Sequence, residues 1–275
     1  MKVSEINNLL ELFFERYKLQ DKNSIFLTPL NNNQRSFTWE ETKNNILKLS
    51  KEISNINQKG DRCLLISENR PEWMISDLSI MLSGSITVPA YTTYVEKDYE
   101  YIINDCQPKV LIVSNQDQFS KIENILKNNT SIKKIISFED LKIDKDKYLN
   151  LKNLNLKNNV SPPSKIDITR KDPACIIYTS GTQGNPKGVI LSHGGILNNC
   201  EGAIEILEPI ISKNSRFLTW LPLSHSYEHA VQFVQICVGA KVFYAESIEK
   251  LIKNMNDCKP HIMTAVPRFY QNLYQ

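Results

Sequence analysis

Residues 63–91 read CLLISENRPEWMISDLSIMLSGSITVPAY and decide the fold class. The short apolar runs at 63–67 and 86–91 are typical of strands that are buried on both faces. Between them a helix is expected from Pro71 to Ser83, because proline is favoured in the first turn of a helix. A buried strand, a helix and a second buried strand are the pattern of a parallel sheet covered by helices. The stretch therefore predicts an α/β fold.

The same alternation extends to both sides of this stretch. Upstream, a helical stripe at 5–19 precedes strand-like runs at 24–28 and 35–39, and Thr38 with Glu41 forms a capping-box pattern that opens a second helix. Downstream, strands are expected at 109–114, 133–137, 174–179, 188–192, 217–221, 241–245 and 261–266, and helices at 96–105, 117–127, 193–207, 225–238 and 248–257. We therefore expect mainly parallel sheet covered by helices.

One segment interrupts the alternation. Residues 139–171 are rich in Lys and Asn and contain Ser-Pro-Pro-Ser at 161–164. Such a composition is typical of a surface connection. The sequence thus predicts two lobes, with the first over residues 1–160 and the start of the second over residues 161–275.

Composition excludes several classes of protein. The chain has 275 residues, of which 41% are hydrophobic and 23% charged, which is typical of a globular fold. A net charge of +3 without a basic run gives no reason to expect a nucleic acid partner. The six cysteines are scattered with no C-x-x-C pair, which favours reduced thiols over disulfides or a metal site.

The chain also lacks the patterns of secretion and of membrane insertion. It has neither an apolar leader at its start nor an apolar run long enough to span a bilayer, so a cytoplasmic protein is expected. Contact with a membrane surface stays open. Residues 266–275 read as a strand end followed by a helix that has barely begun, which suggests the front part of a longer protein.

A glycine-rich loop carries the chemistry. Residues 177–188 read IYTSGTQGNPKG, and so place three glycines, three hydroxyl side chains and Lys187 directly after an expected strand. Backbone N–H groups in such a loop can surround a polyphosphate. The spacing fits neither a Walker A motif nor a G-x-G-x-x-G dinucleotide fingerprint. A surface turn is the alternative on chemistry alone.

The order of residues resembles a known family. The loop, followed by Val-Ile-Leu-Ser-His at 189–193, resembles the phosphate-binding signature of the AMP-forming acyl-adenylate synthetases. Four further segments resemble long-chain fatty-acid–CoA ligases in particular. They are SENRPEW at 67–73, GSITVPAY at 84–91, LPLSHSYEH at 221–229 and AVPRFY at 265–270. Gln183 departs from the Thr or Ser that is commonest at its position.

The resemblance implies a reaction in two steps. A fatty acid reacts with Mg-ATP to give acyl-AMP and pyrophosphate, and the CoA thiol then displaces AMP. By the family pattern, Thr179 is a candidate Mg²⁺ contact. The candidates for holding the phosphates are Thr179, Ser180, Gly181, Thr182, Gln183, Gly184 and Lys187. Donors and a cation that are already in place stabilise the charge on the leaving pyrophosphate, so a Ser224–His225 nucleophile is not needed.

The LPLSHSYEH segment supplies the candidates for the acid substrate. The resemblance places His225 beside the acyl carboxylate, as a catalytic residue together with Lys187, and His229 at the entrance to the acyl tunnel. Tyr227 is expected in the core or in the tunnel wall. Because residues four apart share a helix face, His225 and His229 are expected to line one wall.

Three alternatives follow for the function. The first is the front part of a long-chain fatty-acid–CoA ligase that uses ATP, Mg²⁺ and CoA. In that case the adenine, ribose and CoA contacts lie beyond residue 275, and the chain alone is expected to be inactive. The second is an adenylating ligase for another carboxylic acid. The third is a non-catalytic module that binds an acyl group or a nucleotide.

Overall fold

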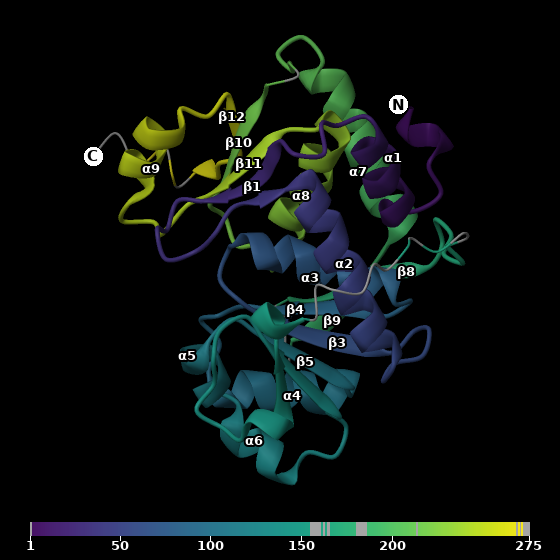
Figure 1. Cartoon of the computed structure of the whole chain (residues 1–275), viewed down its shortest axis with the longest axis vertical. Coiled ribbons are helices and arrows are strands. Elements are labelled where there is room, and N and C mark those ends of the chain that lie inside the picture. Colours follow the sequence, from purple (N-terminus) through teal and green to yellow (C-terminus); the bar gives the residue numbers. More distant parts are fainter. Residues whose placement is uncertain are drawn as a thin grey trace.

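The structure is built from two sheets with helices between them. It is a computed structural model that describes residues 2–154, 161, 163, 166–179, 186–212, 214–267, 269 and 271. In Figure 1 the two sheets lie one above the other, with α2 (Trp39–Ser54) and α3 (Pro71–Leu82) between them. The α/β prediction is confirmed.

The lower sheet of Figure 1 has seven strands within the described residues. In spatial order they are β7 (Tyr148–Asn150), β6 (Lys134–Ser137), β5 (Val110–Val113), β3 (Arg62–Ile66), β4 (Ile86–Ala90), β8 (Pro173–Thr179) and β9 (Lys187–Ser192). All neighbours are parallel except β8 and β9, which form an antiparallel hairpin.

The upper sheet has five strands within the same residues. Their order is β12 (Ile262–Met263), β10 (Arg216–Thr219), β11 (Lys241–Tyr244), β1 (Ile25–Pro29) and β2 (Phe37–Thr38). All neighbours are parallel except β1 and β2.

The sheets do not follow the boundary at residue 160 that the sequence predicts. Leu27 of β1 pairs with Val242 of β11, so an N-terminal strand completes the sheet of the later segment. Conversely, Cys175 of β8 pairs with Thr87 of β4. The two units are therefore interleaved along the chain, because strand pairing depends on which edges meet and not on order in the sequence.

Nine α-helices are found in the described residues. They are α1 (Leu9–Lys18), α2, α3, α4 (Glu96–Cys106), α5 (Gln116–Ser120), α6 (Glu123–Asn128), α7 (His193–Leu207), α8 (Ser226–Val238) and α9 (Leu251–Cys258). Single turns of 3-10 helix occur at Val3–Glu5, Lys145–Lys147 and Leu151–Asn153. In the described part of the chain, none of the helices is both long and apolar enough to cross a bilayer.

Two expectations from the sequence need correction. The helix expected over 117–127 is two short helices, α5 and α6. The segment 139–171, expected as a surface connection, adds strand β7 to the lower sheet and buries Leu151 and Leu154. Leu151 and Leu154 thus belong to the hydrophobic core, although the surrounding segment is rich in Lys and Asn.

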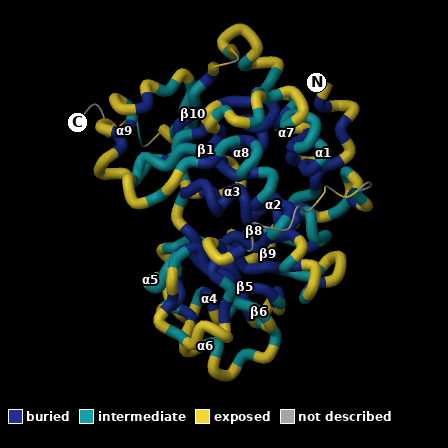
Figure 2. Tube along the Cα trace, in the orientation of Figure 1, coloured by how far each residue is buried: buried dark blue, intermediate teal, exposed yellow. Residues whose placement is uncertain are grey.

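Helix α3 occupies the centre of the molecule. Every residue of the helix except Leu82 is buried (Figure 2). A helix without a solvated face is stable only when other elements cover it on all sides. The first-turn proline is in place at Pro71, as predicted.

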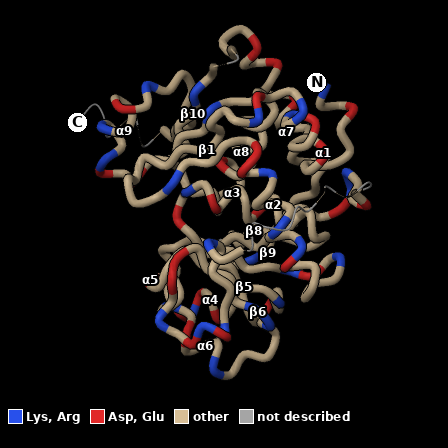
Figure 3. Tube along the Cα trace, in the orientation of Figure 1, with Lys and Arg blue, Asp and Glu red and all other residues tan. Residues whose placement is uncertain are grey.

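Charge is distributed over the surface with few exceptions. Positive and negative residues are interspersed along the described chain, and the strands are mostly uncharged (Figure 3). The buried Asp, Glu, Lys and Arg residues of the described part are Arg70, Glu72, Asp77 and Glu228. All four lie on α3, at its N-cap, or on α8.

The capping box of α2 gives a first prediction. Thr38 Oγ1 accepts from the Glu41 amide at 3.1 Å, and Glu41 Oε2 accepts from the Thr38 amide at 2.9 Å. Thr38→Ala should lower the free energy of unfolding by about 1 kcal/mol in urea denaturation. The exposed Lys51→Ala of the same helix should stay within about 0.5 kcal/mol of the unmodified chain. Equal losses in both variants would contradict the role of the cap.

Candidate functional site

A cleft opens where strands of both sheets end. The residues that follow β3, β4, β10 and β11 enclose a cavity of about 270 Å³. Its walls include Ser67, Glu68, Asn69, Tyr91, Thr92, Thr93, Trp220, Pro222, Ser224, Ala245, Glu246, Ser247 and Ile248. In parallel α/β sheets, ligands bind at the carboxyl ends of the strands. This cleft is therefore the first place to look for a binding site.

Asn69 fastens the two sides of the cleft to each other. Its side-chain amide donates to the carbonyl of Leu221 at 2.6 Å, and its Oδ1 accepts from the amide of Leu223 at 3.0 Å. The loop after β3 and the loop after β10 are thus held at a fixed spacing, although they follow strands of different sheets.

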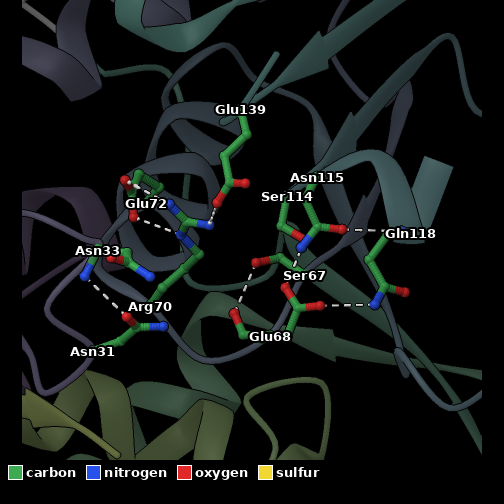
Figure 4. A network of polar contacts seen from close by, with 10 residues as sticks. All are labelled: Asn31, Asn33, Ser67, Glu68, Arg70, Glu72, Ser114, Asn115, Gln118 and Glu139. Atoms are coloured by element: carbon green, nitrogen blue, oxygen red, sulfur yellow. Dashed lines mark hydrogen bonds and ion pairs between the residues drawn. The ribbon is translucent and has the colours of Figure 1, made fainter. Parts of the chain in front are cut away.

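Two carboxylate networks hold the loop after β3 (Figure 4). Glu68 accepts from Ser114 Oγ at 2.6 Å and from Gln118 Nε2 at 2.7 Å. Arg70 is buried and donates to both oxygens of Glu72, at 2.9 and 3.2 Å, and to Glu139 at 2.7 Å. Because their oxygens are already bonded, Glu68 and Glu72 serve to fix the loop.

The candidate phosphate loop begins at the same edge of the lower sheet. Thr179 ends β8, Lys187 begins β9, and the two are paired across the hairpin. Because β8 runs parallel to β4, Thr179 lies at the edge of the sheet that carries Tyr91. Both Thr179 and Lys187 are exposed. The remaining candidates, Ser180, Gly181, Thr182, Gln183 and Gly184, lie outside the described residues.

Gly188 has a packing role that the motif did not reveal. A Cβ at this position would lie 2.8 Å from Ile176 Cγ2 and 3.2 Å from Tyr178 Cζ, across the hairpin. A side chain here would force the strands apart. The glycine therefore lets β9 lie against β8 and so fixes where Lys187 emerges.

His225 lies at the boundary between two environments. Its side chain is exposed, and its Nδ1 caps α8 by accepting from the Tyr227 amide at 3.2 Å. Ser224 lines the cleft on one side, whereas Ser226 and Tyr227 line a second cavity of about 730 Å³ between α7 and α8. That groove is lined by the apolar residues Leu191, Ile196, Ala203, Ile206, Val231 and Val234.

His229 is enclosed, so the expectation of one wall shared with His225 needs correction. Its side chain has no exposed surface, and Nε2 lies 2.8 Å from Asp77 Oδ2 of α3. The reason is that α8 enters the interior within one turn of its cap. Burial by itself lowers the pKa of His229, but Asp77 and Cys175 together outweigh it and raise that pKa well above its usual value. Contact of His229 with an acyl chain stays a prediction.

Glu228 is a functional candidate that the sequence analysis missed. It is buried, and its Oε2 accepts from Thr264 Oγ1 at 2.5 Å. The Thr264 carbonyl in turn accepts from Trp220 of the cleft wall at 2.6 Å. Burial raises the pKa of Glu228 to about 7. The available signal was an acidic residue in the first turn of a helix that is rich in apolar residues.

The donor set at Thr179 suits a metal that arrives with its substrate. In the described part of the chain, no three His, Cys, Asp or Glu side chains gather as a metal centre. Mg²⁺ in nucleotide sites is held by phosphates, waters and one or two protein oxygens. The exposed hydroxyl of Thr179 fits that requirement, so its role as a Mg²⁺ contact stays a prediction.

This fold and cleft define a class. Residues 14–275 match the AMP-binding enzyme family. The chain belongs to that family, and the resemblance found in the sequence is confirmed.

Its relatives include long-chain fatty-acid–CoA ligases. Fatty acyl-CoA synthetase A of Dictyostelium discoideum is 31% identical over 227 residues, which cover 78% of this chain and 33% of that protein. Long-chain-fatty-acid–CoA ligase FadD15 of Mycobacterium tuberculosis is 23% identical over 273 residues, which cover 99% of this chain and 46% of that protein. The chain thus spans between a third and a half of the length of these relatives.

Solved structures share the fold. The luciferase-like enzyme of the mealworm Zophobas morio has a TM-score of 0.80 at 18% identity, covering 96% of this chain and 60% of that one. Apo MatB of Rhodopseudomonas palustris has a TM-score of 0.77 at 20% identity, covering 98% of this chain and 51% of that one. The matched region is therefore only part of each solved chain.

The buried Glu228 predicts a pH-dependent stability. An acid whose pKa is higher in the folded chain favours folding while it is protonated, so stability falls as pH rises from about 4.5 to about 7. Glu228→Gln should match the unmodified chain at pH 4.5 and exceed it in unfolding free energy at pH 8. Exposed Glu205→Gln on α7 should show no such crossover. Urea denaturation across this pH range checks both, and parallel curves for Glu228→Gln and the unmodified chain would refute the assignment.

Proposed function

We propose that the protein activates a long-chain fatty acid with ATP, first to acyl-AMP and then to the CoA thioester. Membership of the AMP-binding enzyme family and the long-chain ligases among the relatives support the reaction. The alternative of a non-catalytic binding module has no comparable support.

One observation carries the choice of substrate. A fatty acid has a charged head and an apolar tail. His225 follows Ser224, which lines the more polar cleft, and precedes Ser226 and Tyr227, which line the mostly apolar groove. The carboxylate would bind near His225, where ATP can reach it from the cleft. The tail would lie along α7 and α8 past Tyr227. The groove, at about 730 Å³, is within the range of ligand pockets.

ATP would bind at the carboxyl edge with its phosphates under the hairpin loop. Lys187 would stabilise the charge that develops on the leaving pyrophosphate, and Thr179 would contact the Mg²⁺ that ATP carries. A cation that is already positioned where charge appears lowers the barrier without reorganisation. Ser180, Gly181, Thr182, Gln183 and Gly184 would contribute further contacts to the phosphates.

A second candidate is the activation of a different carboxylic acid. The fold is shared with a structure of VinN in complex with L-aspartate, at a TM-score of 0.78 and 17% identity, so the architecture alone does not select the acid. The apolar lining of the groove favours the fatty acid over a polar one.

The test is acid-dependent exchange of pyrophosphate into ATP by the whole protein, across saturated fatty acids, short acids, aryl acids and amino acids. Exchange that is fastest with long-chain acids supports the proposal. Exchange only with a short, aryl or amino acid would select the second candidate, and no exchange with any acid would overturn adenylation altogether.

Lys187 gives a prediction that separates the two steps. Lys187→Ala should slow acyl-AMP formation on the order of 10²-fold, because one positioned electrostatic contact is lost. Formation of the thioester from supplied acyl-AMP should change much less, since pyrophosphate has already left. The matched control is Lys241→Ala. Lys241 is an exposed lysine that begins β11, at the end of the strand away from the cleft. Equal damage to both half-reactions would show that Lys187 is structural.

Substitutions at His225 and in the groove are expected to affect the selectivity for chain length differently. His225→Ala should lower kcat/KM for all fatty acids alike, because every substrate has the same carboxylate. Ala203→Phe should fill the groove and reduce kcat/KM mainly for the longest acids, since each methylene excluded is worth about 0.8 kcal/mol. Kinetics over acids of medium to long chain measure both. A uniform loss in Ala203→Phe would place the tail elsewhere.

A further inference from the structure

Helix α8 directs a polar stripe into the interior. Glu228, His229, Gln232 and Gln235 have at most 1% of their surface exposed. Their bonds reach three other elements: Glu228 bonds to Thr264 after β12, His229 and Gln232 to Asp77 on α3, and Gln235 to Thr219 of β10. The apolar groove lies on the same helix, lined by residues such as Val231 and Val234.

Asp77 is the centre of this stripe. Its side chain is completely buried, and Oδ2 lies 2.8 Å from His229 Nε2 and 2.9 Å from Gln232 Nε2. Among the described residues, its ion-pair partner is His229. The rings of Trp73 and Phe233 pack on the imidazole with centroids at 5.2 and 5.7 Å. Cys175 of β8 is the other titratable group that faces the ring.

A buried charge pair is a poor way to gain stability. The loss of hydration of both ions offsets most of their attraction, and apolar residues of similar volume often serve as well. Burial of apolar surface, however, has no preferred direction. A hydrogen-bonded pair can fix the rotation of a helix about its axis and its position along that axis, whereas apolar packing tolerates several such arrangements.

We propose that Asp77 and His229 form a buried carboxylate–imidazolium pair that fixes α8 on α3 and so positions His225 and Tyr227. They are positioning residues for the proposed reaction, on which this inference rests. The link is short: the amide of His229 donates to the carbonyl of His225 at 2.9 Å, and His225 caps the same turn.

The contact between Asp77 and His229 also connects the two sheets. Helix α3 follows β3 of the lower sheet, and α8 follows β10 of the upper sheet. Movement of one sheet relative to the other would therefore act on the pair first, and through it on the carboxylate site. Asn69 provides the second tie between the sheets, at the cleft itself.

The charge of the pair can be measured on the 275-residue chain by NMR of ¹⁵N-labelled histidine. We expect the His229 ring to remain an imidazolium at pH 8, and to be neutral in Asp77→Asn because burial then acts without the carboxylate that stabilises the charge. The ring signals of the exposed His261 should be the same in both proteins at this pH. A neutral His229 ring at pH 7 in the unmodified chain would overturn the pair.

The positioning role is tested on the whole protein with purified, folded variants. Asp77→Asn and His229→Gln should lower kcat for acyl-AMP formation at least tenfold with the KM for ATP unchanged, because small displacements of a reacting group have large effects. The exchanged pair, Asp77→His with His229→Asp, should recover part of the rate. Ser79→Ala, which removes a buried hydrogen bond of α3, should retain kcat.

The outcomes are distinguishable. Unchanged kcat in folded Asp77→Asn and His229→Gln would remove the positioning role and leave the proposed function intact. Absence of acid-dependent exchange in the unmodified protein would overturn both, while the NMR result would still decide whether the charge pair exists.

Discussion

The burial of α3 is the constraint on which the rest of the structure depends. A helix without a solvated face requires cover on every side, and here α2, α8 and the two sheets provide it. Because α3 follows β3 directly, its N-terminus and the preceding loop lie at the carboxyl edge of the lower sheet. The position of the helix therefore sets the position of Asn69 and Arg70, and with them one wall of the cleft.

The polar interior follows from the same arrangement. Within the described chain, buried Asp, Glu, Lys and Arg residues are confined to α3, its N-cap and α8. Arg70 with Glu72 and Glu139 holds the entrance of α3, whereas Asp77 with His229 holds its middle against α8. These bonds are directional, so under the proposed positioning role they fix how the two helices are oriented. A site whose residues come from two sheets requires that the helices between the sheets be held in one orientation.

The proposed chemistry uses two environments that meet at one residue. The cleft at the strand ends is lined by both polar and apolar residues and would hold the nucleotide, while the groove between α7 and α8 is mostly apolar and would hold the alkyl chain. His225 caps α8 at the junction, and its exposure contrasts with the burial of His229 one turn later. Because α8 enters the interior within one turn, His225 can meet substrate whereas His229 can hold the helix in place.

Local patterns in the sequence determined much of this protein. The first-turn Pro71, the Thr38–Glu41 box and the glycine-rich loop between two strands follow from periodicity and from residues that act on their near neighbours, so each could be recognised without coordinates. Only the tertiary structure decided that β1 joins β11 and β8 joins β4, that residues 148–150 complete a sheet, and that His229 faces Asp77. These features depend on which surfaces meet across 13 to 215 residues of chain, and no local pattern encodes that choice.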